Sequence, residues 1–136
     1  MIAALIGAAG AGRAVLESVV SPRVPQMTTP ASIRQITVQE LKSMLDRGTP
    51  LELWDVRTPA ERSVARIEGA RLLDQEGAAY IESLDRDTPL VFHCHHGIRS
   101  QAAAQYFSAK GFTNLCNVVG GIDAWSQLVD ASVPRY

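Results

Sequence analysis

From residue 33 onward, short apolar segments typical of β-strands alternate with segments of helical periodicity. The strand-like segments are Ile33–Ile36, Leu51–Val56, Ala70–Leu73, Pro89–His93 and Leu115–Val119. Helices are predicted to begin near Thr37 and to cover Pro59–Ala65, Glu76–Leu84, Arg99–Lys110 and Ile122–Leu128. This alternation predicts an α/β fold, namely an open, mostly parallel sheet of four to five strands with helices on both faces.

Residue types at two of the predicted helices indicate how they begin and which side is buried. Thr37 and Glu40 fit a capping box, in which each side chain accepts a hydrogen bond from the other residue's backbone N–H. In the helix Arg99–Lys110, we expect the buried face to carry Ala103, Tyr106 and Phe107. Both helices would then pack against the sheet through one apolar face.

Composition narrows the function classes. The formal net charge of -1 over 136 residues leaves no basic excess that would favour binding to nucleic acid. No apolar run approaches the roughly 18 residues that span a bilayer, so no membrane association is expected. Two cysteines cannot form a disulfide framework, and the cytoplasm is therefore the expected compartment.

Residues 1–32 are predicted to be an N-terminal segment and linker, partly helical or disordered, before a domain at residues 33–136. The apolar stretch Ile2–Gly12 lacks a preceding Lys or Arg and contains three glycines, which argues against a secretory signal. Those glycines follow the spacing G-x-x-G-x-G, whereas a dinucleotide-binding turn requires G-x-G-x-x-G. Neither export nor dinucleotide binding is therefore expected.

The segment Phe92–Ser100, which reads F-H-C-H-H-G-I-R-S, carries the chemistry. Cys94 ends a central strand just before a helix, which is where open α/β sheets build their sites. Backbone N–H groups of the turn and the positive end of the helix would stabilise a thiolate there. Gly97 permits a turn that a side chain would block, and Arg99 offers a planar fork suited to an oxyanion.

Cys116, by contrast, lies within a predicted strand and has none of these neighbours in the sequence. A lone cysteine in a strand is usually a small buried hydrophobic residue. We therefore expect Cys116 to be structural and unreactive.

Four segments in order resemble the rhodanese family. Cys94–Arg99 resembles its six-residue active-site loop, and Asp55–Arg57 resembles the D-V-R that ends an earlier strand. Ala65–Ala70 is similar to the G-H-I-x-G-A segment, and Gly120-Gly121 with Trp125 resembles the terminal G-G-x-x-x-W. The resemblance extends over residues 33–128 and leaves the N-terminal segment outside. It departs from the family at Arg66, where a His is usual, and at Ser63, near which many members have an aromatic residue.

The resemblance implies a rhodanese-like fold and a sulfurtransferase. It would move sulfane sulfur from thiosulfate or a persulfide donor to a thiol or cyanide, through a persulfide on Cys94. A thioredoxin- or glutaredoxin-like protein is one possible thiol acceptor, and no cofactor is expected. The substrate-binding loop would comprise His95, His96, Gly97, Ile98 and Arg99. Asp55 and Arg57 would support this loop from below through an ion pair or hydrogen bonds.

The first alternative is a cysteine-dependent phosphatase or arsenate reductase. Cysteine phosphatases use H-C-x5-R-[ST], in which the loop surrounds the oxygens of a phosphoryl group. Here Arg99 gives the spacing C-x4-R, and Ser100 occupies the position that would have to be Arg. The shorter loop suits a single sulfur atom better than a tetrahedral phosphoryl group.

Two further alternatives are metal binding and a module without catalysis. Four consecutive potential ligands, His93 to His96, leave a strand, and their side chains are expected to point in alternating directions away from a common ion. No metal site is therefore predicted, and His95 and His96 are expected to be solvated at the mouth of the pocket. A rhodanese-like module used for binding, regulation or partner-directed sulfur relay remains open, although such modules commonly lack the cysteine.

Overall fold

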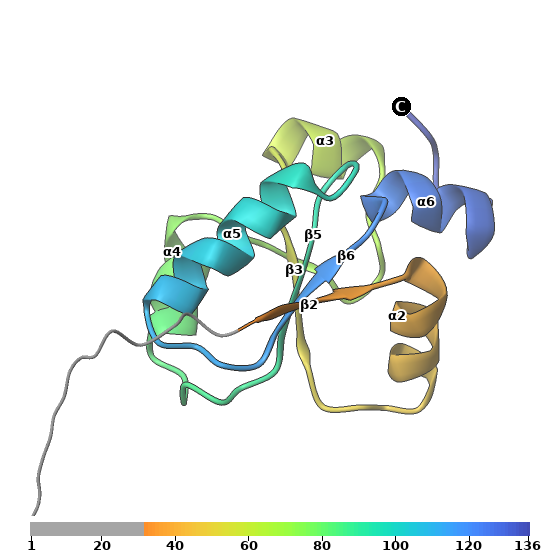
Figure 1. Cartoon of the computed structure of the whole chain (residues 1–136). Helices are drawn as coiled ribbons and strands as arrows, with labels where there is room; N and C mark the ends of the chain where they lie inside the picture. The colour runs from red at the N-terminus through yellow and green to blue at the C-terminus, as the bar shows by residue number, and fades with distance from the viewer. Residues whose placement is uncertain (1–31) are drawn as a thin grey trace, which may run out of the picture.

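The computed structural model describes residues 32–136, which form a parallel sheet with helices on both faces (Figure 1). The strands are β2 (Ile33–Ile36), β3 (Glu52–Asp55), β4 (Arg71–Leu72), β5 (Leu90–His93) and β6 (Leu115–Val118). The helices are α2 (Val38–Asp46), α3 (Pro59–Val64), α4 (Gln75–Glu82), α5 (Ile98–Ala109) and α6 (Gly121–Leu128). The predicted α/β class is confirmed. The predicted N-terminal segment and linker, residues 1–32, lie outside the described residues except for Ser32.

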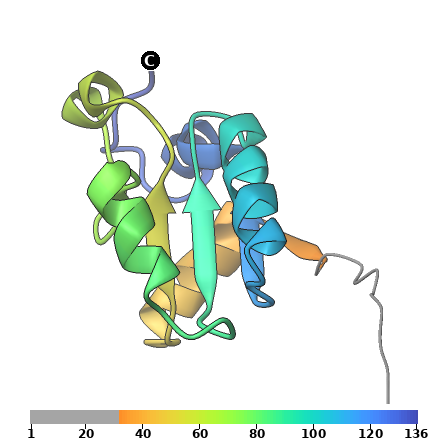
Figure 2. The ribbon, with the colours of Figure 1, turned by 90° about the vertical axis from the view of Figure 1, so that its left-hand side faces the viewer.

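The sheet has the strand order β2-β6-β5-β3-β4, and every neighbouring pair is parallel. β5 is thus the central strand, as predicted for the strand that Cys94 ends, and β4 lies at an edge. In Figure 2 the arrowheads of β3 and β5 point to the same end of the molecule, where α3 also lies. The residues that follow these two strands are therefore brought together at one edge of the sheet.

Both faces of the sheet are buried, which explains the nearly continuous apolar strands. Helices α2 and α6 cover one face, and α4 and α5 cover the other (Figure 1). The first face buries Ile36, Leu41, Leu53, Val91, Cys116, Val118, Ile122 and Trp125. The second buries Trp54, Ile81, Leu90, Phe92, Ala104, Phe107, Phe112 and Leu115. Because successive strand residues point to opposite faces, Leu53 and Trp54 belong to different cores.

The predicted start of α2 is confirmed, and the predicted buried face of α5 needs one correction. Glu40 N–H donates to Thr37 Oγ1 at 3.0 Å and Thr37 N–H to Glu40 Oε1 at 2.7 Å, so the capping box is present. In α5, the predicted face is wrong in part, because Tyr106 is 50% exposed. The buried positions follow the spacing of one helix face and are Ser100, Ala104, Phe107 and Ser108. Tyr106 lies beside that face and packs edge-on against Phe107.

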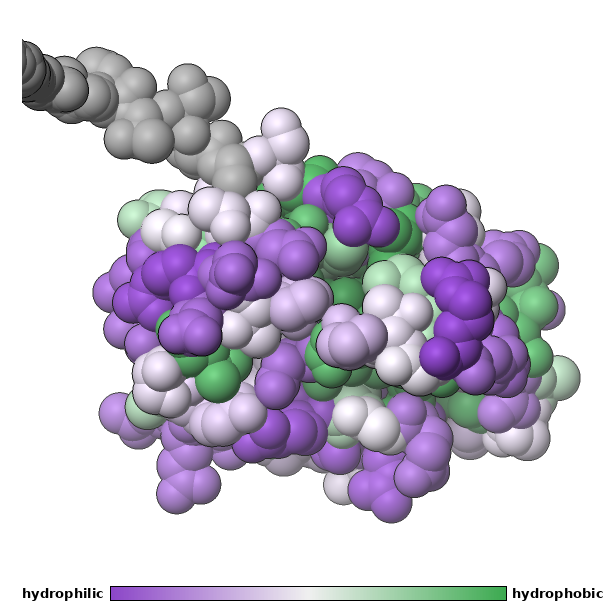
Figure 3. Space-filling view, turned by 90° about the horizontal axis from the view of Figure 1, so that it is seen from below, coloured by the Kyte–Doolittle hydropathy of each residue, from purple (hydrophilic) through white to green (hydrophobic). Residues whose placement is uncertain are grey.

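The surface seen in Figure 3 mixes hydrophilic and hydrophobic residues without one dominant apolar area. Within the described residues 32–136, no helix has the length and apolar character needed to cross a membrane. Cys116 is buried against the first core, and burial raises the pKa of its thiol. The prediction that Cys116 is a packed structural residue is therefore confirmed.

Candidate active site

The turn between β5 and α5 holds Cys94 and is shaped by close backbone approaches. Gly97 has φ +105°, a left-handed conformation that favours glycine and was anticipated from the sequence. A Cβ atom on Gly121 would lie 2.4 Å from the carbonyl oxygen of Cys94, so only glycine fits there. Ile122 N–H donates to that same oxygen at 2.9 Å. The start of α6 therefore fixes the turn from outside.

The sulfur atom of Cys94 accepts hydrogen bonds from the inside of this turn. Gly97 N–H lies 3.0 Å from Sγ, Ser100 N–H 3.4 Å and Ser100 Oγ 3.3 Å. Burial is the largest single influence on the pKa of Cys94 and raises it, because the residue is only 1% exposed. Hydrogen bonds to the sulfur have the opposite effect and together outweigh burial, so the pKa of Cys94 is lowered. Their donors are the Ser100 hydroxyl and the backbone N–H groups of Ser100, Gly97 and His96. The site thus favours an anionic sulfur.

Ser100 is a site residue that the sequence pattern did not predict. Its hydroxyl also lies 2.6 Å from Asn117 Oδ1, and Asn117 Nδ2 donates to Gly97 O at 3.2 Å and to Gln35 Oε1 at 2.9 Å. A hydroxyl has one hydrogen, so Ser100 can donate to Asn117 or to the sulfur but not to both. The sequence did contain a sign of this buried polar network, because Asn117 interrupts the otherwise apolar strand β6.

Asp55 and Arg57 form the expected ion pair, whereas their support of the Cys94 loop stays a prediction. Arg57 donates from Nε and Nη2 to the two oxygens of Asp55, both at 2.7 Å, and both side chains are fully buried. Arg57 also donates to Ala65 O at 2.7 Å and to the Tyr136 hydroxyl at 2.8 Å. This network joins the end of β3 to the segment after α3 and to residue 136, and is therefore structural.

His93 lies in the same buried region, directly before the cysteine. Its Nε2 is 3.9 Å from Asp55 Oδ1 and has no hydrogen-bond partner among the described residues. Burial lowers the pKa of His93 to about 4, so the ring is neutral near pH 7. Its Nδ1 lies 3.3 Å from Cys94 O, and the ring packs beneath the reactive turn.

Arg99 makes a contact that the sequence did not predict. Its Nη1 and Nη2 donate to the two carboxylate oxygens of Glu61 at 2.8 and 2.9 Å. These hydrogen bonds hold the pKa of Glu61 far below its usual range. Glu61 also accepts a bond from the Tyr136 hydroxyl at 2.9 Å. The fork expected to face an oxyanion is therefore occupied by a carboxylate of the protein itself, supplied by α3.

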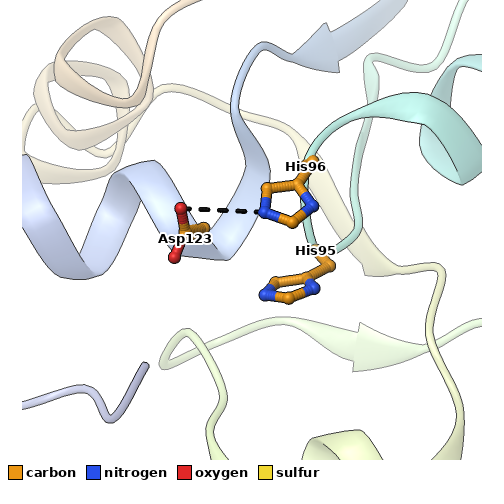
Figure 4. Close-up of side chains that lie close together, drawn as sticks. All are labelled: His95, His96 and Asp123. Carbon is orange, nitrogen blue, oxygen red and sulfur yellow. Dashed lines mark ion pairs between the residues drawn. The ribbon is translucent and has the colours of Figure 1, made fainter. Parts of the chain in front are cut away.

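The remaining loop residues, His95, His96 and Ile98, lie on the outer side of the turn. Ile98 is 80% exposed and His96 is exposed, as expected for residues at a pocket mouth. His95 is partly buried because its ring stacks on Tyr136, with ring centroids 4.2 Å apart. The prediction that neighbouring side chains diverge is wrong for His95 and His96, whose ring centroids are 3.9 Å apart (Figure 4). Both residues come after the end of β5, where side chains no longer alternate between the two faces of the sheet.

These contacts define what the arrangement can do chemically. A buried sulfur that accepts several hydrogen bonds is stabilised as a thiolate, which is the nucleophilic form. The same donors would hold a second sulfur or a developing negative charge at this position.

Comparisons with known proteins agree with this geometry. The family model of the rhodanese-like domain matches residues 37–128, which run from α2 to α6 and include the Cys94 turn. Thiosulfate sulfurtransferase GlpE from Pseudomonas aeruginosa is 32% identical over 101 residues, covering 74% of this chain and 90% of that protein. Thiosulfate sulfurtransferase GlpE from Shewanella oneidensis is 35% identical over 98 residues, covering 71% of this chain and 96% of its own.

Solved structures show the same fold. The crystal structure of a rhodanese-like domain protein from Staphylococcus aureus superimposes with a TM-score of 0.61 at 28% sequence identity. The match covers 76% of this chain and 99% of that one. The similarity therefore extends over nearly the whole length of the neighbour.

Proposed function

This chain belongs to the rhodanese-like domain family, and we propose that it is a sulfurtransferase that carries sulfur as a persulfide on Cys94. The observation that carries the proposal is the set of hydrogen bonds to Cys94 Sγ from Gly97 and Ser100. The relatives named thiosulfate sulfurtransferase support thiosulfate as one donor. The cytoplasm, where a free thiol stays reduced, suits this chemistry.

In the first half-reaction, the Cys94 thiolate attacks the outer sulfur of thiosulfate. A bond forms between Sγ and that sulfur, the S–S bond of thiosulfate breaks, and sulfite leaves with the electron pair. The Cys94 persulfide anion remains in the turn, where N–H groups and the Ser100 hydroxyl stabilise its charge. No proton transfer to the leaving group is required, which agrees with the neutral and buried His93.

In the second half-reaction, an acceptor nucleophile takes the outer sulfur. A thiolate or cyanide attacks the terminal sulfur of the persulfide, and the Cys94 thiolate leaves and is restored. A small thiol reaches this atom through the mouth at His96 and Ile98, both of which are exposed. A protein thiol of a thioredoxin- or glutaredoxin-like partner is a further acceptor that we propose on chemical grounds.

Arg99 is the group that we propose for contact with the anionic part of the donor. In the resting structure its fork is paired with Glu61, and an anionic donor must compete with that carboxylate. The Glu61–Arg99 pair would thus weaken the binding of thiosulfate more than that of an uncharged persulfide. This makes Glu61 a specificity residue for the donor.

A phosphatase or arsenate reductase receives less support from the contacts. Such an enzyme would require Arg at position 100, whereas this chain places there a serine whose hydroxyl lies 3.3 Å from Sγ. The hydrogen bonds converge on the sulfur itself, which leaves less room for the oxygens of a phosphoryl group. A partner-directed relay module would use the same persulfide and differs only in the acceptor.

The proposal is tested by transfer of sulfur from thiosulfate to cyanide, measured as thiocyanate. Cys94→Ser should abolish transfer, because a serine hydroxyl neither ionises near pH 7 nor forms a persulfide. Cys116→Ser should retain most of the rate, because Cys116 packs in the core away from the turn. Transfer that survives in Cys94→Ser but is lost in Cys116→Ser would overturn the assignment.

A further inference from the structure

Beside the sulfur-carrying turn lies a second group of side chains, none of which takes part in the bond changes of the proposed reaction. We call His95, His96 and Asp123 the mouth cluster (Figure 4). Each residue offers one ligand atom, and these atoms all lie within 4.8 Å of one another. The shortest described approach is 3.7 Å, between His96 Nε2 and Asp123 Oδ2. Two imidazoles and a carboxylate from two different elements thus converge.

The backbone fixes the two elements that carry these side chains. Asp123 N–H donates to His95 O at 3.1 Å, one residue beyond the bond from Ile122 to Cys94. Gly121 permits this close approach, because a Cβ there would lie 2.5 Å from His95 O. The cluster is therefore held by the same contacts that shape the reactive turn, and a ligand would not have to order a loop.

One residue of the mouth cluster carries a polar atom without a hydrogen-bond partner among the described residues. His95 Nε2 is buried and has no hydrogen-bond partner within residues 32–136. A buried polar atom without a partner is uncommon in folded proteins and points to an unoccupied interaction. The imidazole ring of His95 stacks on Tyr136, and the ring of His96 lies at a tilt of 31° to it with centroids 3.9 Å apart. A neutral imidazole nitrogen is a frequent ligand of first-row transition metals.

The spacing is compatible with an ion such as Zn²⁺. Zinc binds His nitrogen and carboxylate oxygen at about 2.0–2.2 Å, which places tetrahedral ligand atoms roughly 3.4 Å apart. No separation in the cluster exceeds 4.8 Å, so the ligand atoms would have to approach one another by at most about 1.4 Å to reach that spacing. His96 is exposed, and rotation of its side chain can supply this movement. Three protein ligands would leave one position open to water or to a small anion.

We propose that His95, His96 and Asp123 form a binding site for a divalent transition-metal ion of the zinc class. The site goes beyond the proposed sulfur transfer and does not depend on it. Arg135 competes with the ion, because its Nε lies 2.9 Å from Asp123 Oδ1 and its Nη2 3.4 Å from Oδ2. The Arg135 hydrogen bond also lowers the pKa of Asp123 and keeps the carboxylate ionised. Metal binding therefore exchanges Arg135 for the ion at Asp123.

The test measures zinc affinity by chelator competition on the untagged full chain. It is performed on the wild type and on Cys94→Ser, in which the thiolate can no longer act as a ligand. In both backgrounds, Asp123→Asn and His96→Gln should weaken binding at least about tenfold. Arg135→Gln should tighten binding by up to about fivefold, because it removes the competing cation. The melting temperature of each variant is measured in the absence of zinc to verify folding.

Several outcomes would overturn the proposal. Zinc affinity that is lost in Cys94→Ser alone would identify the thiolate as the ligand. Equal affinity in the parent, Asp123→Asn and His96→Gln would place any bound ion elsewhere. Absence of binding to the parent and to Arg135→Gln would show that the cluster is not a metal site. Because the readout is affinity, failure here leaves the proposed sulfur transfer untouched.

Discussion

Replacement of Ser100 by alanine isolates the hydroxyl that contacts Cys94. In the structure its oxygen lies 3.3 Å from Sγ and 2.6 Å from Asn117 Oδ1, so one hydrogen serves two acceptors. With a neutral thiol, the shorter distance favours donation to Asn117. When the thiol ionises, the hydroxyl can turn to the sulfur, and the bond to Asn117 is then lost.

The expected shift in the pKa of Cys94 follows from this exchange of hydrogen bonds. A hydrogen bond to a charged group contributes about 1.5–3 kcal/mol, whereas the neutral bond that is given up contributes about 0.5–1.5 kcal/mol. The difference is on the order of 1–1.5 kcal/mol in favour of the thiolate. At about 1.36 kcal/mol per unit, Ser100→Ala should raise the pKa of Cys94 by about one unit.

The assay is the pH dependence of Cys94 alkylation by iodoacetamide, in a Cys116→Ser background so that one thiol reacts. Ser108→Ala is the matched control, because Ser108 is a buried serine of the same helix two turns farther along. We expect the midpoint to shift upward in Ser100→Ala and to stay in place in Ser108→Ala. An unchanged or lowered midpoint in Ser100→Ala would refute the role of the hydroxyl.

Three further predictions follow from the contacts of the site. Glu61→Gln preserves the capping box at Thr58 but removes the charge that faces Arg99, so KM for thiosulfate should fall by up to about fivefold in steady-state kinetics. A KM that stays the same or rises would contradict this. Asp55→Asn breaks a fully buried ion pair and should lower the free energy of unfolding by about 3–5 kcal/mol in urea titrations, whereas a loss below about 1 kcal/mol would show that the pair is dispensable. His93 has a pKa of about 4 in the folded chain and near 6.5 when unfolded, so the unfolded state binds more protons between these values. The free energy of unfolding should therefore fall by about 3 kcal/mol as the pH drops from 6.5 to 4. If urea titrations of His93→Gln show the same fall, the fall belongs to other groups.

The alternation of apolar strands and amphipathic helices was sufficient to predict the layers of the fold. Each core strand carries residues of both cores, as Leu53 and Trp54 illustrate, and this appears in the sequence as an apolar run. The position of Cys94 after the central strand followed from the same pattern. The error at Tyr106 arose because i, i+3 and i+4 neighbours fit more than one helix face, and only packing against β5 and β6 selects one.

The contacts among distant side chains could not be predicted from spacing. Glu61 lies 38 residues before Arg99, and no local rule joins them. The pairing depends on the place of α3 next to the turn after β5, which only the assembled sheet determines. Ser100 was overlooked for a related reason, because its hydroxyl turns inward with the first turn of α5. His95 and His96 were expected to diverge as in a strand, although the chain has already left the strand at these residues.

The central claim is that Cys94 carries the transferred sulfur, and intact-protein mass spectrometry after incubation with thiosulfate tests it most directly. The account predicts one added sulfur atom on the wild type and on Cys116→Ser. The adduct should disappear on treatment with cyanide or a reducing thiol, and it should be absent from Cys94→Ser. A sulfur adduct of equal yield on Cys94→Ser, or none on a wild type that transfers sulfur to cyanide, would contradict the persulfide mechanism.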